Sequence, residues 1–459
     1  MSTASSASSV DLARALDEGH WSPFQKLLLA FAALAFAVDG LANQVIGLAI
    51  PALVQDWQVQ PKAFSPVQAL SLAGVAFGTV LGGLLGDRLG RRVGLIGSVL
   101  FFGAMTVASA FVQDVPTLAL LRFFDGLGIG GAIPNGAALI SEFTPQRRRA
   151  VAISLGMVFI PVGGLLSGLI GKWALPAVGW QGLFMIAGAL PIVLGIVFLF
   201  ALPESPRFLS RKPERRAELV KLLARCGQHF GTDCVFTEER AHEGRTRLAL
   251  LFDPRTLRST LALWSAFFFC LLASYTMFSW IPTLLASAGF SLADASSGTA
   301  SFHFGGIVGG VVSGWLIGHY GSKRAVIALA GGCVLGALML GLMHFDPAQG
   351  LTWVALALIV EGFFIAGLHT GVYTLAAYIY PPFVRATGVG AASAAGRIGA
   401  VVSAYTGVIT LQLGGASSYF IVIAGTAAIA MISIALIKQH IPGSAPSDGP
   451  APTPQRAPA

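Results

Sequence analysis

The sequence predicts an all-α membrane protein with twelve transmembrane helices arranged as two pseudo-symmetric six-helix bundles. Composition is the first observation: hydrophobic residues make up 55% of the 459 residues and charged residues only 11%, whereas soluble proteins carry about 25% charged residues. The second observation is a series of long apolar stretches, and the third is an internal repeat. A chain with so few charges is expected to expose most of its exterior to lipid.

The apolar stretches number twelve, and each has at least the roughly 20 residues that a helix needs to cross a bilayer. Six precede a long polar stretch and six follow it. The expected spans are residues 25–54, 65–86, 93–112, 116–142, 150–173, 179–202, 259–287, 295–318, 324–344, 350–380, 386–411 and 415–437. The expected divisions are a polar, flexible N-terminal tail (1–24), an N-terminal bundle (25–202), a central loop (203–258), a C-terminal bundle (259–437) and a proline-rich, disordered tail (438–459).

The distribution of lysine and arginine predicts the orientation in the membrane. Lys62 and Lys172 fall on one side of the predicted spans, and Arg122 and Arg397 fall inside them. All the other basic residues lie on the side of the termini and the central loop. Because cytoplasmic loops carry an excess of lysine and arginine, we expect both termini and the central loop to be cytoplasmic. Topology then explains the net charge of +8, and nucleic acid is not an expected partner.

The sequence carries no motif of an enzyme. The phosphate-binding Gly-Lys-Ser/Thr loop of ATP-driven pumps is absent. The four cysteines, Cys226, Cys234, Cys270 and Cys333, lack the spacing of a zinc or redox site and are expected to be unpaired. We therefore expect no catalysis, no metal ion and no cofactor, and a monomer surrounded by lipid.

Two correspondences relate the halves of the chain. The segment "GGLLGDRLGRRVGLIG" (82–97) resembles "GWLIGHYGSKRAVIAL" (314–329), with glycines, a polar pair and a basic pair in the same order. The segment "LISEFTPQRRRA" (139–150) aligns with "LAAYIYPPFVRA" (375–386) without a gap. Internal repeats are the usual architecture of secondary transporters, whose substrate site lies between the repeats near the bilayer midplane.

Charged residues in the repeated segments are predicted to form a gate on the cytoplasmic side. Asp87 can take the positive end of a neighbouring helix or pair with an arginine, which would make a latch that breaks as the gate opens. The structural alternative is a topology signal combined with a tight turn. The residues assigned to the gate are Asp87, Arg88, Arg91, Glu142, Arg149, His319 and Arg385.

Several motifs carry a resemblance to a known family. The loop "GDRLGRR" (86–92) resembles the signature loop of the major facilitator superfamily, and "RFFDGLGIGG" (122–131) resembles its fourth-helix arginine motif. More narrowly, "DGLANQVIGLAIP" (39–51), "PESPRFL" (203–209) and "YPPFVRATGVGAASAAGRIGA" (380–400) resemble the aromatic acid:proton symporters. The resemblance implies the major facilitator fold, a bacterial inner membrane location, and import of a small aromatic carboxylate with protons by alternating access.

Asp39 is the candidate proton site. It lies at the middle of the first predicted span, and no other residue from Leu27 to Pro51 is ionisable. Burial favours the neutral form of a carboxylate and a nearby arginine favours the charged form, so such a group can bind and release a proton. The structural alternative is a hydrogen-bonded helix anchor. Members of the family often carry a second acid where this chain has Ala42, so Asp39 is expected to act alone in this helix.

The other charged residues within the spans have two interpretations each. Arg122 is expected to pair with Asp39 or with Asp125, and this pairing is either part of proton coupling or purely structural. Arg397 offers a planar fork suited to the substrate carboxylate, and the alternative is an ion pair with Glu361. Glu361 occupies the position of Asp125 in the repeat, so it is either a second proton site or structural. The residues assigned to proton coupling are Asp39, Arg122, Asp125 and Glu361.

An aromatic acid needs an apolar pocket with one positive anchor. The residues assigned to substrate binding are Arg397, Trp280, Tyr373, Asn43 and Phe124. His303 and His369 also fall inside spans, and both are expected to make hydrogen bonds rather than to carry protons.

The function that the sequence favours is a proton-coupled importer of a small aromatic anion. One alternative is a proton antiporter that exports drugs or metabolites. Another is a sugar transporter, because "PESPRFL" also occurs in sugar porters. A third, from a different class, is a membrane receptor that binds a ligand without moving it.

Overall fold

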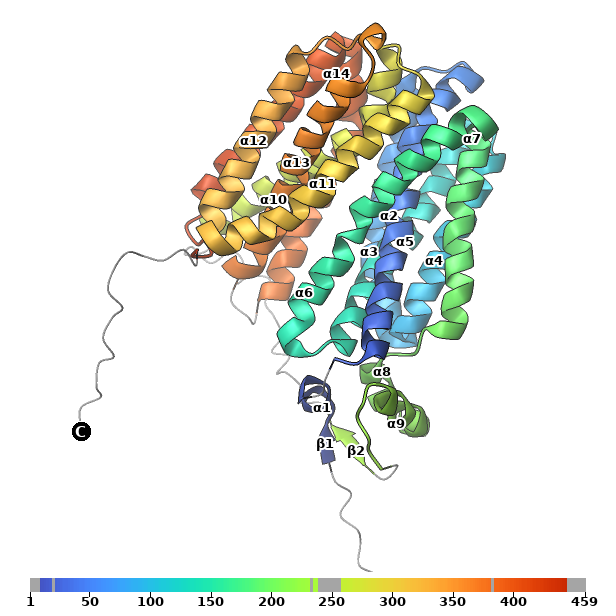
Figure 1. Ribbon diagram of the computed structural model, residues 1–459, viewed down its shortest axis with the longest axis vertical. Coiled ribbons are helices and arrows are strands. Elements are labelled where there is room, and N and C mark those ends of the chain that lie inside the picture. Colours follow the sequence, from blue (N-terminus) through green and yellow to red (C-terminus); the bar gives the residue numbers. More distant parts are fainter. Residues whose placement is uncertain (1–8, 19–20, 232–233, 238–256, 381–383, 444–459) are drawn as a thin grey trace, which may run out of the picture.

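The computed structural model describes residues 9–18, 21–231, 234–237, 257–380 and 384–443, and in these ranges it is almost entirely helical (Figure 1). The N-terminal half contains α2 (Pro23–Trp57), α3 (Ser65–Leu89), α4 (Arg91–Ala108), α5 (Val115–Phe143), α6 (Gln146–Met157) and α7 (Phe159–Ala201). The C-terminal half contains α10 (Leu257–Ser287), α11 (Leu292–Tyr320), α12 (Ser322–Leu342), α13 (Thr352–Ile379) and α14 (Arg385–Leu436). The remaining elements are β1 (Ser9–Asp11), α1 (Leu12–Glu18), α8 (Pro206–Ser210), α9 (Arg216–Arg225), β2 (Val235–Thr237) and short 3₁₀ turns at Pro61–Phe64, Ser109–Phe111, Pro213–Arg215 and Pro347–Gln349.

Every predicted span falls on a helical segment of the structure. Nine helical stretches in the described ranges are long and apolar enough to cross a membrane. Helices α7 and α14 each cover two predicted spans. The backbone is not helical at Gly179 of α7 or at Gly414 and Gly415 of α14, and these breaks separate the two spans. Gly179 and Gly415 have φ values of 69° and 61°, which glycine adopts without steric cost. The prediction of an all-α membrane protein is confirmed.

The two copies of the repeated loop make the same turn. Gly90 ends α3 with φ 108°, and its N–H bonds to the Gly86 carbonyl. Gly321 ends α11 with φ 82°, and its N–H bonds to the Ile317 carbonyl. The same conformation at matching positions of the sequence repeat indicates that the two halves are built alike.

Close helix crossings also match between the halves. A Cβ atom on Gly126 of α5 would overlap the Ser71 carbonyl oxygen of α3. A Cβ atom on Gly362 of α13 would overlap the Phe302 carbonyl oxygen of α11. The second and fourth long helices of each half therefore pack backbone to backbone, which makes the halves pseudo-symmetric.

The two halves approach each other at one end of the molecule. We call the end that carries α1, α8 and α9 the basic end, and the halves lie closest at the end away from it (Figure 1). Two hydrogen bonds in the described ranges join the halves near this opposite end, one from Gln44 to Phe278 and one from Gln68 to Ser279. Helix α7 also packs on α11 across the same boundary.

A small module covers the N-terminal half at the basic end. Strand β1 pairs in parallel with β2 of the central segment, and α1 lies beside α8 and α9 (Figure 1). Leu12 and Leu16 of α1 are buried in one cluster with Leu219, Leu222 and Leu223 of α9. The sequence suggested a flexible tail here. Residues 9–18 instead form ordered elements, because Leu12 and Leu16 lie one turn apart and share a buried face.

The chain also leaves α14 along a defined path. The Ser322 N–H donates to the Ile441 carbonyl at 2.9 Å, and the Ile441 N–H donates to Ser322 Oγ at 2.8 Å. This part of the predicted C-terminal tail therefore contacts the turn between α11 and α12. The predicted disorder of residues 444–459 and the part of the predicted central loop at 238–256 lie outside the described residues.

Candidate functional site

Polar side chains from both halves meet near the middle of the long helices. We call Asp39 of α2, Tyr275 of α10, His369 and Tyr373 of α13 and Arg397 of α14 the central cluster. Arg397 Nη1 donates to the Tyr275 hydroxyl at 3.2 Å. The Arg397 charge also acts on Asp39, His369 and Tyr373. The cluster therefore joins the buried acid of α2 to a cation of the other half.

Asp39 is held by a close crossing of α2 and α7. A Cβ atom on Gly40 would overlap the Ile160 carbonyl, and one on Gly163 would overlap the Ala37 carbonyl. The Asp39 side chain is 2% exposed, and its Oδ1 has no hydrogen-bond partner in the described part of the chain. A buried charge without a full set of partners is costly, so this carboxyl is suited to exist in a neutral, protonated form as well.

Arg397 lies in a stretch of small residues that brings α14 against α10. A Cβ atom on Gly399 would overlap the Phe268 carbonyl. The Arg397 side chain is partly exposed and forms no ion pair within the described ranges. Because an arginine presents five N–H donors in a planar fork, donors remain for a carboxylate ligand beyond the bond to Tyr275.

Tyr275 of α10 and Tyr373 of α13 are the aromatic side chains that interact with this arginine. The Tyr373 hydroxyl lies 3.2 Å from Ser393 Oγ, and its ring centroid lies 4.8 Å from that of Phe267 in an edge-to-face arrangement. The His369 ring lies 5.3 Å from the Tyr373 ring. The surroundings of Arg397 thus combine aromatic faces with hydroxyl groups, as an aromatic acid requires.

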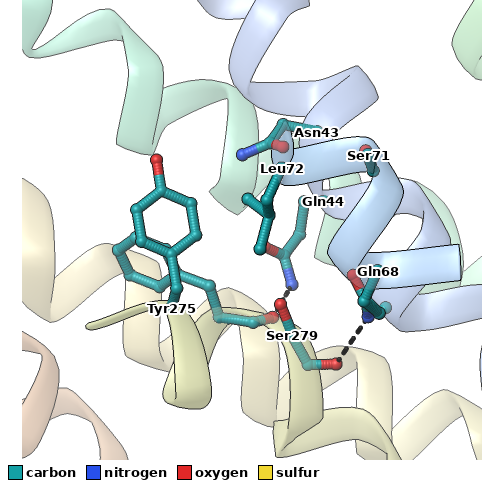
Figure 2. Close-up of a pocket in the computed structure, with 9 residues that line it drawn as sticks. Asn43, Gln44, Gln68, Ser71, Leu72, Tyr275 and Ser279 are labelled. Atoms are coloured by element: carbon teal, nitrogen blue, oxygen red, sulfur yellow. Dashed lines mark hydrogen bonds between the residues drawn. The ribbon is translucent and has the colours of Figure 1, made fainter. Parts of the chain in front are cut away.

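A small polar cavity lies between the central cluster and the opposite end. Figure 2 shows Tyr275 and Ser279 of α10 facing Asn43, Gln44 and Gln68 of the N-terminal half. The cavity volume is about 10 Å³, close to what one water molecule requires. It is too small for an aromatic ring, so the two halves are closed against each other here.

Arg122 pairs with Asp125 and with no residue of the central cluster in the described part of the chain. Arg122 Nη1 lies 3.1 Å from Asp125 Oδ2, and Arg122 Nη2 donates to Ser109 Oγ at 2.9 Å. Thr106 Oγ1 donates to Asp125 Oδ1 at 2.7 Å, and the guanidinium lies 5.1 Å from the centroid of the Phe184 ring. Of the two partners expected for Arg122, the structure therefore pairs it with Asp125 and not with Asp39.

Glu361 occupies the matching place in the C-terminal half, and it does not pair with Arg397. Its side chain is fully buried, and Glu361 Oε1 accepts from the Cys333 thiol of α12 at 3.1 Å. Asp125 likewise accepts from α4, which is the equivalent helix of its half. Glu361 Oε2 has no hydrogen-bond partner within the described ranges.

The other residues assigned to substrate binding lie in different places. Asn43 lines the small polar cavity. Trp280 does not line it: its side chain is fully buried in the core of the C-terminal half, where it fills the space beside Gly407. Phe124 is 38% exposed and packs edge-on against Phe123.

The residues assigned to the gate lie at the basic end, and their described contacts fall within one half each. Arg91 pairs with Asp87 and lies 3.6 Å from Glu142, which also accepts from Ser205. Arg88 is exposed. The remaining gate residues contact their own surroundings: the Arg385 Nε donates to the Tyr380 carbonyl, His319 stacks on Trp315, and the Arg149 Nε is buried without a hydrogen-bond partner in the described ranges.

Sequence reasoning missed Gln44, Gln68 and Ser279, which join the halves beside the cavity. Neutral amides and hydroxyls carry no charge signal in an apolar sequence. One signal was present: Pro282 lies inside α10, and a proline leaves the carbonyl four residues earlier, that of Phe278, without its helical partner.

The chain matches the family model described as the Major Facilitator Superfamily over residues 32–360. It is 31% identical over 413 residues to the 4-hydroxybenzoate transporter PcaK of Acinetobacter baylyi, covering 89% of this chain and 90% of that protein. It is 32% identical over 409 residues to the gallate transporter of Pseudomonas putida, covering 88% of this chain and 90% of that protein.

Among solved structures, the fold is similar to the partially occluded inward-open conformation of the xylose transporter XylE from E. coli. The TM-score is 0.70 at 18% identity, and the match covers 91% of this chain and 99% of that one. The motifs, the two matching halves, the family model and these relatives agree: the chain belongs to the major facilitator superfamily, and it is a membrane transporter rather than an enzyme.

Proposed function

We propose that this transporter imports a small aromatic carboxylate together with protons across a bacterial inner membrane, with its basic end in the cytoplasm. The observation that carries the proposal is the position of Arg397. It lies at the boundary of the two halves beside Asp39, bonded to Tyr275 and without an ion-pair partner in the described ranges. The two relatives are a 4-hydroxybenzoate transporter and a gallate transporter, which supports the same class of substrate.

Arg397 is the proposed anchor of the substrate carboxylate. A bidentate pair with an arginine is among the strongest charge-assisted hydrogen bonds, and it fixes the direction of the aromatic ring. The ring would then lie against the aromatic side chains around Tyr373. A neutral sugar would make no use of a cation in this position, which favours the acid over the sugar.

Asp39 is the proposed proton carrier. It is electrostatically attracted to Arg397, and Asp125 adds a weaker like-charge effect. When a substrate carboxylate occupies Arg397, the attraction that favours the charged form of Asp39 is weakened, and Asp39 then binds a proton more readily. Because Ala42 is fully buried and carries no charge, Asp39 performs this role without a second acid at that position.

The pair of Arg122 and Asp125 has a supporting role in this proposal. It ties α5 to α4 through Thr106, and it ties α5 to the part of α7 after Gly179 through Phe184. It keeps the N-terminal half rigid as the halves move, and Asp125 contributes to the potential at Asp39. Glu361, with its thiol donor, is proposed to play the equivalent structural part in the other half.

Uptake into proteoliposomes tests the proposal. Purified protein is reconstituted, and accumulation of labelled 4-hydroxybenzoate is followed with an acidic exterior, without a pH gradient, and with a protonophore. We expect accumulation above the external concentration only with the gradient, and its loss on adding the protonophore. Equal uptake in all three conditions would exclude proton coupling, and uptake of xylose but of no hydroxybenzoate would exclude the substrate class.

A further inference from the structure

Helix α10 carries an unusual acceptor at the boundary between the halves. Pro282 lies inside the helix and has no N–H, so the Phe278 carbonyl four residues earlier lacks its normal helical partner. Unpaired buried carbonyls are costly and are nearly always satisfied by some other donor. The donor for this carbonyl comes from the other half of the protein.

Two glutamines of the N-terminal half reach this stretch of α10. Gln44 Nε2 of α2 donates to the Phe278 carbonyl at 2.5 Å, and Gln68 Nε2 of α3 donates to the Ser279 carbonyl at 3.4 Å (Figure 2). Both glutamine side chains are buried, at 4% and 3% exposure. These are the two hydrogen bonds between the halves in the described ranges, and both end on neighbouring carbonyls of one helix.

The backbones also approach closely at this point. A Cβ atom on Gly47, one turn after Gln44, would lie 3.0 Å from the Ser279 carbonyl oxygen. Helices α2 and α10 are therefore in contact just beyond the small polar cavity, which has room for about one water molecule. Any opening at this end must break both glutamine bonds.

We propose that Gln44, Gln68 and the Phe278 and Ser279 carbonyls form a latch that holds the end opposite the basic end closed. The glutamines are positioning residues: they set the balance between closed and open states and need not touch the substrate. This inference rests on the proposed alternating-access function. A net hydrogen bond of typical strength changes such a balance about fivefold, so loss of the Gln44 bond favours opening by that factor.

Distances between spin labels test the latch directly. Labels at Gln60 and Ser287, both exposed near the opposite end on different halves, report its opening. A second pair at Arg147 and Arg324, exposed at the basic end, reports the reverse movement. The background needs only Cys234→Ser, because the other three cysteines are buried.

The variants are chosen to separate the latch from general damage. Gln44→Leu removes the donor, and Pro282→Ala restores the helical N–H so that the Phe278 carbonyl no longer needs Gln44. Gln25→Leu is the matched control: Gln25 Nε2 also donates to a backbone carbonyl, that of Phe143 at 2.8 Å, but within one half.

We expect Gln44→Leu and Pro282→Ala each to raise the long-distance population at the Gln60–Ser287 pair about fivefold, and Gln68→Leu to raise it less. Gln25→Leu should keep the wild-type distribution. The latch is wrong if both test variants give the wild-type distribution, or if Gln25→Leu opens this end equally. The measurement uses no substrate, so a protein that shows the shift but moves no aromatic acid would overturn the proposed function and leave the latch standing.

Discussion

Asp39 and Arg397 attract each other across the boundary between the two halves without forming an ion pair in the described part of the chain. One side chain belongs to the first long helix of the N-terminal half and the other to the last long helix of the C-terminal half. A substrate carboxylate between them would compete with Asp39 for the arginine. This competition would link anion binding to protonation of Asp39.

The first prediction concerns the substrate anchor. Arg397→Leu should raise the KM for 4-hydroxybenzoate uptake about 10- to 100-fold, because charge-assisted hydrogen bonds to the carboxylate are lost. Arg397→Lys should fall between this variant and wild type, since lysine keeps the charge but not the fork. Initial rates over a range of concentrations give the KM.

Arg324→Leu is the control, because Arg324 is an exposed arginine of the same half. It should transport like wild type. An unchanged KM in Arg397→Leu would place the carboxylate elsewhere in the protein.

A second prediction concerns the buried pair in the N-terminal half. Arg122→Leu should lower the free energy of unfolding by about 3–5 kcal/mol, because Asp125 would remain as an uncompensated buried charge. The double variant Arg122→Leu/Asp125→Leu should be more stable than the single one. Thermal unfolding in detergent measures both. Equal stability of the single variant and wild type would show that the pair does not hold α5 in place.

A third prediction concerns the crossing that positions Asp39. Gly163→Ala should destabilise the protein by about 1–3 kcal/mol and reduce uptake, because the new Cβ atom meets the Ala37 carbonyl and pushes α7 away from α2. Gly97→Ala is the matched control, since a Cβ atom on Gly97 of α4 meets nothing within 4 Å. If the two variants unfold at the same temperature, the crossing is not tight.

A fourth prediction concerns the module at the basic end. Burial raises the pKa of the Cys226 thiol to about 11, with a smaller opposing effect of Arg225. Because the thiolate is the reactive form, Cys226 should resist maleimide at pH 7.5 in the folded protein. Leu12→Asp, which disrupts the packing of α1 on α9, should expose Cys226 and speed its labelling. Mass spectrometry of the tryptic peptide measures the extent, and rapid labelling in wild type would contradict the packing.

The helices could be predicted because each span is a local property of the chain. Hydropathy alone located the long helices. The resemblance of the two loops indicated a repeat, and the structure gives Gly90 and Gly321 equivalent turns. The module at the basic end could not be predicted in this way. Its strands pair residues 9–11 with residues 235–237, and such a contact between distant segments leaves no local pattern.

The site was predicted in part for a similar reason. The rarity of charges in the spans singled out Asp39 and Arg397, which the structure brings into one cluster. Spacing could not decide whether Arg122 pairs with Asp39 or with Asp125, because the choice depends on how the helices pack, which the sequence does not give. Nor could the polar neighbours of Trp280 reveal that its ring packs into the core beside Gly407.

Proton coupling through Asp39 is the central feature of the proposed mechanism, and one pair of assays on Asp39→Asn tests it most directly. The first assay is accumulation of labelled 4-hydroxybenzoate driven by a pH gradient, and the second is exchange of labelled for unlabelled substrate without a gradient. The amide keeps the shape of the side chain but cannot bind and release the proton. We predict that Asp39→Asn loses gradient-driven accumulation and retains exchange. Gradient-driven accumulation at the wild-type level in Asp39→Asn would contradict coupling through this residue.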